Sequence, residues 1–292
     1  MVPVRFLEPQ PNLKAMSTGS AFKPRVVSIA GTDPTGGAGA QADIKAISAA
    51  GGYAMSVITS IVSQNTLGVI DVFHPPIKVV QSQLEAISDD VVIDAIKIGM
   101  LGTSEVIDCV HTWLQHQPSS PVVLDPVMVS TSGHRLLDSA AEDALRQLLP
   151  LASLITPNIP ELAVLSNSEP ASDLEGAIEQ GRQVLQRYGC SVLVKGGHLS
   201  GEPLNAVLKA TEDGSDISVH VIENQRVHTS NTHGTGCSLS SAIATRLGAG
   251  ESLEAAVQWA TQWLHGALEA ADALQVGKGH GPVDHFHHLQ IN

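Results

Sequence analysis

The chain has 292 residues, of which 43% are hydrophobic, 15% charged and only 3% aromatic, so it can build a large core mainly from Ala, Val, Leu and Ile. Its net charge of −13 and its lack of a basic run exclude nucleic acid as a main partner, because neutralising phosphates requires clustered Lys and Arg. No apolar stretch is long enough to cross a membrane, so a membrane partner is not expected.

The three cysteines are Cys109, Cys190 and Cys237. Their odd number and wide spacing fit neither a disulfide framework nor a zinc knuckle. We therefore expect a reducing, cytoplasmic setting. Cys109 and Cys190 fall within or at the end of helical patterns and are interpreted as structural.

Residues 1–24 contain several prolines and no apolar core of signal-peptide type, and we interpret them as a flexible leader. Residues 25–292 show no linker, no internal repeat and no shift in composition. They are predicted to form a single domain.

Apolar runs of strand type alternate with segments of helical periodicity from Arg25 onward. The predicted strands are Val26–Ala30, Met55–Ser63, Asp94–Met100, Pro121–Met128, Ala152–Asn158 and Ser191–Gly197, followed by a hairpin of Ala206–Lys209 and Ile217–Ile222. The predicted helices are Gln41–Ala50, Val79–Ser88, Ser104–His116 with Ser104 as N-cap, Cys237–Leu247 and Leu253–Ala273.

This alternation predicts an α/β fold with a mostly parallel sheet and helices on both faces. Ligands of such folds bind at the carboxyl ends of the strands. The unusual residues of this chain do follow predicted strands. They include the Gly-rich loop from Gly31, Gln64-Asn65, Gly99-Met100, Asp125-Pro126, Pro157-Asn158 and Lys195-Gly196-Gly197.

The segment HGTGC, residues 233–237, has two glycines leading into a helix. Backbone N–H groups of such a turn converge on an anion, and the helix dipole adds positive potential, so a phosphate would fit. It is neither a Walker A loop nor a dinucleotide fingerprint. An ordinary glycine turn before a buried helix would have the same sequence pattern.

Cys237 lies where that helix begins, and a helix N-terminus lowers a thiol pKa. The sulfur could therefore act as a general base toward a substrate hydroxyl. The alternative is a small buried hydrophobic residue.

The second Gly-rich loop, AGTDPTGGAGAQAD, ends in Asp43, which could cap a helix or bind a polar ligand. Asp125 and Glu161 are carboxylates beside strand ends, suited to hold Mg²⁺ near phosphates or else to act as caps or surface charges. Lys195 could neutralise a phosphate.

Taken together, these motifs resemble one family, the hydroxymethylpyrimidine and phosphomethylpyrimidine kinases of thiamine synthesis. The resemblance runs in order from about residue 25 to residue 288. It rests on AGTDPTGGAGAQADIK, SVITSIVSQNT, IKIGML, VVLDPVM, LITPNIPE, VLVKGGH, NTHGTGCSLSSAIA and VGKGHGPVDHF.

The resemblance implies a ribokinase-like fold, a three-layer α/β/α sandwich. It also implies a homodimer that transfers the γ-phosphoryl group of ATP, with Mg²⁺, to 4-amino-5-hydroxymethyl-2-methylpyrimidine and then to its monophosphate. Cys237 would be the base, and Gly234 and Gly236 would form the anion hole. Asp125 and Glu161 would organise the metal, with Lys195 assisting.

The other implied site residues bind substrate or nucleotide. Asp43 and Gln64 would hydrogen-bond the aminopyrimidine, because a Gln both donates and accepts and an ionised Asp accepts from an amino group. The remaining residues are Gly31, Met100 and Val127 near the substrate, and Asn158 and Thr235 near the nucleotide. Ser130–Arg135 is the segment expected to close over the site.

Three alternatives stay open. A pyridoxal kinase would share the scaffold, although Gln64-Asn65 favours the pyrimidine. A sugar or nucleoside kinase would typically have Asp in place of Cys237. A non-catalytic binding or regulatory protein would be expected to have lost at least one of Asp125, Glu161, Lys195 and Cys237.

Overall fold

The computed structural model describes residues 22–117, 120–128, 139–198, 203–211 and 213–289. An eight-stranded sheet forms its centre, in the order β10-β9-β8-β7-β6-β5-β1-β2. Its strands are β1 (Arg25–Ala30), β2 (Tyr53–Ile58), β5 (Ala95–Ile98), β6 (Val122–Leu124), β7 (Leu154–Ile155), β8 (Ser191–Lys195), β9 (Asn205–Ala210) and β10 (Ile217–Ile222).

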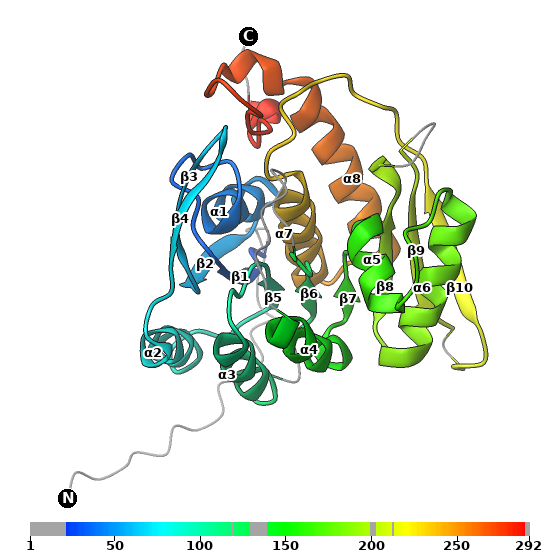
Figure 1. The fold of residues 1–292 in the computed structure, drawn as a ribbon, viewed down its shortest axis with the longest axis horizontal. Coiled ribbons are helices and arrows are strands. Elements are labelled where there is room, and N and C mark those ends of the chain that lie inside the picture. The colour runs from blue at the N-terminus through cyan, green and yellow to red at the C-terminus, as the bar shows by residue number, and fades with distance from the viewer. Residues whose placement is uncertain (1–21, 118–119, 129–138, 199–202, 212, 290–292) are drawn as a thin grey trace, which may run out of the picture.

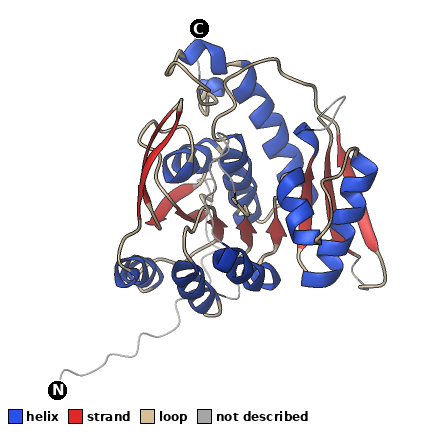
Figure 2. Ribbon diagram, viewed as in Figure 1, coloured by secondary structure: helices blue, strands red, loops and turns tan. Residues whose placement is uncertain are grey.

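Strands β2, β1, β5, β6, β7 and β8 run parallel, and β9 and β10 complete the sheet in antiparallel fashion. Helices cover both faces, giving three layers (Figures 1 and 2). One face packs against α1 (Gly39–Ala49), α7 (Thr235–Gly248) and α8 (Leu253–Glu269). The other packs against α2 (Ile77–Ser88), α3 (Ser104–Leu114), α4 (Ser139–Leu148), α5 (Ile159–Ser166) and α6 (Leu174–Tyr188). The expected three-layer α/β/α sandwich is confirmed.

Alternating side chains of the strands supply two separate cores. In β1, Val26 belongs to the core under α1, α7 and α8, and Val27 belongs to the core on the opposite face. In β6, Val123 and Leu124 divide in the same way. Because both faces of these strands are buried, their sequences read as continuous apolar runs rather than as alternating ones.

The predicted strand over Met55–Ser63 is wrong in its extent. The chain leaves the sheet after β2, turns at Thr59-Ser60, and begins β3 (Ile61–Asn65), which pairs with β4 (Gly68–Phe73) as a separate hairpin. Thr59 Oγ1 donates to the carbonyl oxygen of Met100 at 2.6 Å, which holds the turn against the sheet edge. Two strands therefore lie where the apolar run indicated one.

The predicted N-cap at Ser104 is also wrong by one residue. Thr103 has the extended backbone that an N-cap requires, and its side chain accepts a hydrogen bond from the Val106 N–H at 3.3 Å. The helices α4, α5 and α6 were not predicted. None of the helices in the described part of the chain is both long and apolar enough to span a bilayer.

Candidate functional site

Polar side chains at the strand ends face the beginning of α7. Asp125 directly follows β6, and Lys195 ends β8, each two residues after a side chain that packs on the α7 side of the sheet. Lys195 Nζ donates to Asp125 Oδ1 at 3.2 Å, and Thr156 Oγ1 donates to the same oxygen at 2.8 Å. Burial favours the neutral amine, but Asp125 and Glu161 outweigh it and raise the pKa of Lys195.

The turn that starts α7 lies directly over this ion pair. A Cβ atom at Gly236 would stand 3.4 Å from Asp125 Oδ2 and 3.6 Å from Lys195 Nζ. The first N–H groups of a helix have no partners within the helix. The geometry therefore combines a lysine, a carboxylate and a helix N-terminus at one point, which suits a phosphoryl group that carries a divalent cation.

Gly234, the N-cap of α7, has a φ of 78° and presses against the other Gly-rich loop. A Cβ atom at this position would overlap the carbonyl oxygen of Gly37. The two glycine loops, nearly 200 residues apart in sequence, therefore meet backbone to backbone. The structure brings together Gly234, Gly236, Thr235 and Cys237 with Asp125 and Lys195, as the strand-end argument required.

Asp33 and His233 join these loops and were not predicted. The buried Asp33 carboxylate accepts from the N–H groups of Gly37 and Ala38 at 3.1 and 2.8 Å, and it lies 2.8 Å from His233 Nε2. Burial acts to raise the pKa of Asp33, but hydrogen bonds from His233 and Thr35 hold it at about 2. A histidine directly before the GTG turn was the one signal available in the sequence.

The thiol of Cys237 is half-buried at the first turn of α7. Burial raises its pKa to about 11, although Lys97 and the Gly39 N–H act to lower it. The expected lowering of this pKa is therefore wrong. The rule for helix N-termini counts the dipole, whereas here the loss of water around the thiolate has the larger effect.

Glu161 and Asn158 form a capping box at the start of α5. The Asn158 side chain accepts from the Glu161 N–H, and the Glu161 carboxylate accepts from the Asn158 N–H, each at 2.9 Å. Burial and the nearby Asp125 raise the pKa of Glu161 to about 7, against the opposing effect of Lys195.

The donor set fits Mg²⁺ held jointly with phosphates. The described residues include no cluster of three or more His, Cys, Asp or Glu that could hold a metal by itself. Mg²⁺ is commonly bound by only one or two carboxylates together with substrate phosphates. Burial and the charge of Asp125 disfavour the ionised form of Glu161, and a bound cation would favour it.

Four of the predicted substrate residues lie near the first Gly-rich loop, near Asp125 or on β3. Gly31 and Met100 lie together, since a Cβ atom at Gly31 would come within 2.6 Å of Met100 Cε, and Val127 is half-buried just after Asp125. Gln64 was expected to follow a strand, but it lies within β3, at a bulge. Val62 of the same strand donates its N–H to Thr32 Oγ1 at 3.0 Å, which ties the hairpin to the first glycine loop.

Asp43 lies in the middle of α1 and is fully enclosed, so it caps no helix. Its oxygens accept from Ser28 Oγ, Ser241 Oγ and Lys97 Nζ. Its side chain therefore faces the core under Cys237 rather than a ligand. The segment expected to close over the site, Ser130–Arg135, lies outside the described residues.

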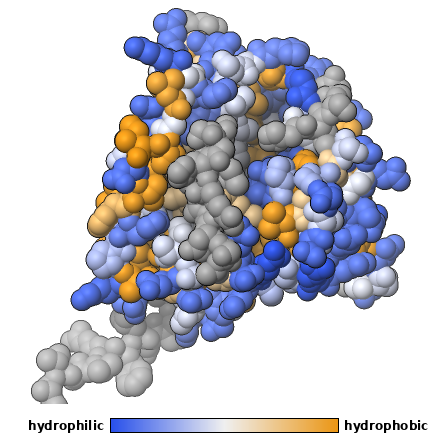
Figure 3. Space-filling model, viewed as in Figure 1, coloured by the Kyte–Doolittle hydropathy of each residue, from blue (hydrophilic) through white to orange (hydrophobic). Residues whose placement is uncertain are grey.

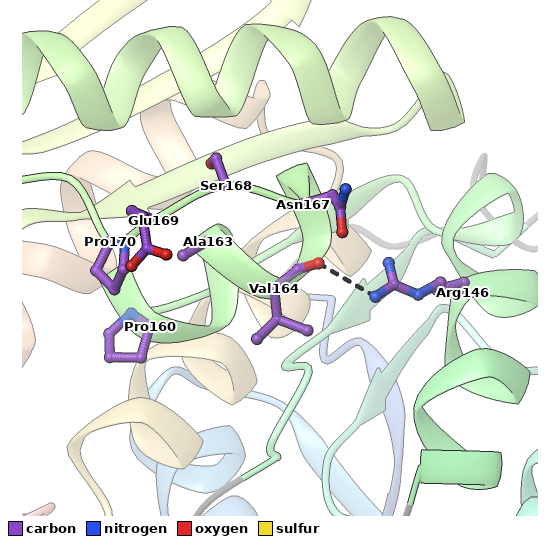
Figure 4. Close-up of a pocket in the computed structure, with 8 residues that line it drawn as sticks. All are labelled: Arg146, Pro160, Ala163, Val164, Asn167, Ser168, Glu169 and Pro170. Carbon is purple, nitrogen blue, oxygen red and sulfur yellow. Dashed lines mark hydrogen bonds between the residues drawn. The ribbon is translucent and has the colours of Figure 1, made fainter.

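A surface hollow of about 760 Å³ lies beside α4 and α5 (Figure 4). Arg146 at its rim donates to the carbonyl oxygen of Val164 at 3.1 Å, and Glu169 and Pro170 line its other side. None of the predicted site residues lines it. Pro160 and Ala163, which line it, lie on α5 beside Glu161, so the hollow borders the helix that carries this site residue.

Replacing Glu161 with Gln is expected to stabilise the protein at pH 8 but not at pH 4. The pKa of Glu161 is about 7 in the folded chain and near 4.5 in the unfolded chain, so stability falls as pH rises from 4.5 to 7. Gln removes this loss and keeps the capping geometry. Urea unfolding should show a gain of about 1–3 kcal/mol at pH 8.

The matched control is Glu175→Gln, in the exposed first turn of α6, which should change stability by less than about 0.5 kcal/mol at either pH. A Glu161→Gln protein that is less stable than the native chain at pH 8 would contradict this account of the buried carboxyl group.

Known proteins are similar to this chain in both sequence and structure. The family model for phosphomethylpyrimidine kinase matches residues 33–284. The hydroxymethylpyrimidine/phosphomethylpyrimidine kinase of Escherichia coli is 46% identical over 263 residues, covering 89% of this chain and 97% of that protein. An ADP complex of Bacillus subtilis pyridoxal kinase has a TM-score of 0.82 at 29% identity, covering 92% of this chain and 100% of the other.

The thiamine biosynthesis multifunctional protein ThiED of Corynebacterium efficiens is 56% identical over 265 residues. The match covers 90% of this chain but only 35% of that relative, so the chain spans about a third of its length. The fold is ribokinase-like, as the resemblance implied. On the extent of the family match and the identity to full-length relatives, the chain belongs to the phosphomethylpyrimidine kinase family.

Proposed function

We propose that this chain is an ATP- and Mg²⁺-dependent kinase of thiamine biosynthesis. Its substrates would be 4-amino-5-hydroxymethyl-2-methylpyrimidine and then the monophosphate of that alcohol, which it converts to the diphosphate. The observation that carries the proposal is the start of α7 over the Asp125–Lys195 pair, with Cys237 on its first turn. Two relatives named for this activity match this chain over 97% of their own length.

The proposed chemistry is positioning and charge stabilisation, which dominate phosphoryl transfer. The backbone N–H groups of Gly234 and Gly236 hold the transferring phosphoryl group, and Lys195 neutralises its charge. Thr235 and Asn158 line the nucleotide side. Asp125 and Glu161 would hold Mg²⁺, which when bound would neutralise charge on the ATP phosphates.

The hydroxymethyl oxygen of the substrate attacks the γ-phosphorus, its proton passes to the thiolate of Cys237, and ADP leaves. Because the thiol has a pKa of about 11, the base acts through the small ionised fraction, stabilised by nearby cations. Gln64, Met100, Val127 and Gly31 surround the ring. Asp43 contributes through the groups it holds rather than by touching substrate.

The test is product mass. Purified protein is incubated with Mg²⁺-ATP and either the aminopyrimidine alcohol or pyridoxal. The proposal expects a pyrimidine product that gains first one and then a second phosphate. Phosphate on pyridoxal alone would favour the second candidate, a pyridoxal kinase, which the TM-score of 0.82 to the Bacillus subtilis enzyme supports. Binding without turnover would indicate a regulatory protein.

We also propose a cytoplasmic homodimer with residues 25–292 as one catalytic domain. The β3–β4 hairpin exposes Ile61, Ile70 and Phe73, and Leu67 lies at its turn. Ile61 and Phe73 pair across the hairpin, and a hydrophobic area gathers over β3 and β4 in Figure 3. Monomers rarely expose large apolar patches, so a second copy is the proposed cover.

Phe73→Glu is expected to convert the dimer to a monomer, because a charge would be buried against apolar side chains at the interface. Light scattering should give twice 30.5 kDa for the native chain and 30.5 kDa for the variant. Val221→Glu, at another exposed apolar position, on β10, should remain dimeric. A native chain that is monomeric at micromolar concentration would contradict this assignment.

A further inference from the structure

Lys97 is a cation enclosed in the middle of the sheet. It lies on β5 between Ile96 and Ile98, and its side chain has no exposed surface. Lysines are almost never fully buried unless they are paired. Lys97 Nζ donates to both carboxylate oxygens of Asp43, at 2.7 and 2.8 Å.

The same carboxylate binds two further elements. Ser28 Oγ of β1 donates to Asp43 at 2.6 Å, and Ser241 Oγ of α7 donates at 2.8 Å. Ser241 follows Cys237 by one helical turn, so the two side chains lie on the same face of α7. The Lys97–Asp43 pair thus lies under the part of α7 that carries the thiol.

Stability alone does not account for this pair. Removing two charges from water is costly, and buried ion pairs can often be replaced by apolar side chains without loss of stability. The pair also occupies the α7 side of β5, the side on which the strand-end residues Asp125 and Lys195 lie. A buried charge at such a place is better explained by what it does to its neighbours.

Charged groups from several parts of the fold act on the Cys237 thiol. Lys97 of β5 and Lys195 of β8 favour the thiolate, whereas Asp43 of α1 and Asp125 after β6 oppose it. Lys97 has the largest effect of any charged group on the pKa of this thiol, second only to burial. It also interacts electrostatically with Asp125.

We propose that Lys97 is a positioning residue for phosphoryl transfer, a fixed cation held by Asp43 that stabilises negative charge on the sulfur of Cys237. The assignment rests on the proposed function, in which Cys237 accepts the substrate proton. It predicts opposite results for the two members of the pair. Loss of Lys97 should disfavour the thiolate, and loss of the Asp43 charge should favour it.

The test measures the thiol without turnover, so it stays separate from the test of kinase activity. In a Cys109→Ser/Cys190→Ser background, Cys237 is the remaining thiol, and its alkylation by iodoacetamide is followed by mass at pH 8.5. The rate follows the thiolate fraction, since pH 8.5 lies below the pKa. Lys97→Met should slow alkylation about tenfold, one pKa unit, and Asp43→Asn should accelerate it at least about threefold.

Lys45→Met is the matched control. It removes one positive charge from the same helix as Asp43, but Lys45 bonds the Gly36 carbonyl oxygen and is not among the groups with the largest effects on the pKa of the thiol. Its alkylation rate should stay within about twofold of the parent. Circular dichroism confirms that each variant is folded.

Opposite shifts for Lys97→Met and Asp43→Asn support the assignment, because loosening of the structure would change both rates in one direction. Rates that move together, or that both stay within twofold of the parent, overturn it. If Lys97→Met does not fold, Asp43→Asn decides alone: faster alkylation supports the assignment, and an unchanged or slower rate overturns it.

Discussion

Replacing Cys237 with alanine is expected to lower kcat for the aminopyrimidine alcohol by about 10²- to 10⁴-fold while leaving KM within about threefold. The sulfur takes a proton only as the hydroxyl attacks, so its loss removes an interaction of the transition state and not of substrate binding. The side chain is half-buried at the start of α7, and its loss should change stability little. Steady-state rates with coupled ADP detection measure both constants.

Cys109→Ala is the control for this experiment. Cys109 lies on α3, on the opposite face of the sheet from α7, and its replacement should leave kcat unchanged. If folded Cys237→Ala retains more than a tenth of the native kcat, the cysteine is not the base. The anion-binding turn would then be the main source of catalysis.

Replacing Gly234 with alanine is expected to abolish activity and to destabilise the fold by more than about 3 kcal/mol. Two costs add at this position. A residue with a side chain is strained at a φ of 78°, and the new Cβ atom would overlap the Gly37 carbonyl oxygen. The clash is with backbone, so no side chain can move aside to relieve it. Thermal or urea unfolding of the two proteins measures the difference.

Two further glycines separate these costs. Gly250, just beyond α7, has a φ of 90° with open space around it, so Gly250→Ala isolates the backbone strain at about 1–2 kcal/mol. Gly236→Ala meets Asp125 and Lys195 only at ordinary contact distances and should fold, yet lose activity because its methyl group fills the anion site. Equal stability losses at Gly234 and Gly250 would show that the two loops do not press together as described.

The sheet was readable from sequence because strands buried on both faces are continuous apolar runs, as in β1 and β6. The hairpin was not, because the run from Met55 to Ser63 conceals a turn at Thr59-Ser60. The Thr59 hydroxyl bonds the Met100 carbonyl oxygen and the Ser60 hydroxyl bonds the His74 ring, and both partners are distant in sequence. Strand-end logic found Asp125 and Lys195, since the carboxyl ends of parallel strands meet at one edge.

Side-chain pairs whose members lie far apart in sequence could not be predicted. Asp33 pairs with His233 and Asp43 with Lys97, and no local pattern marks either pair. The error over the Cys237 thiol has a similar origin. A helix start is visible in the sequence, whereas the burial that raises the thiol pKa depends on how α1, β5 and α7 come together.

The most direct test of the proposed function is the ratio of kcat/KM for the aminopyrimidine alcohol to that for pyridoxal, measured with one preparation under the same Mg²⁺-ATP conditions. A site built to hydrogen-bond one ring discriminates strongly against another that leaves its polar groups unpaired. We predict a ratio above about 100 in favour of the pyrimidine. A ratio below one would assign the site to pyridoxal and contradict the proposed substrate.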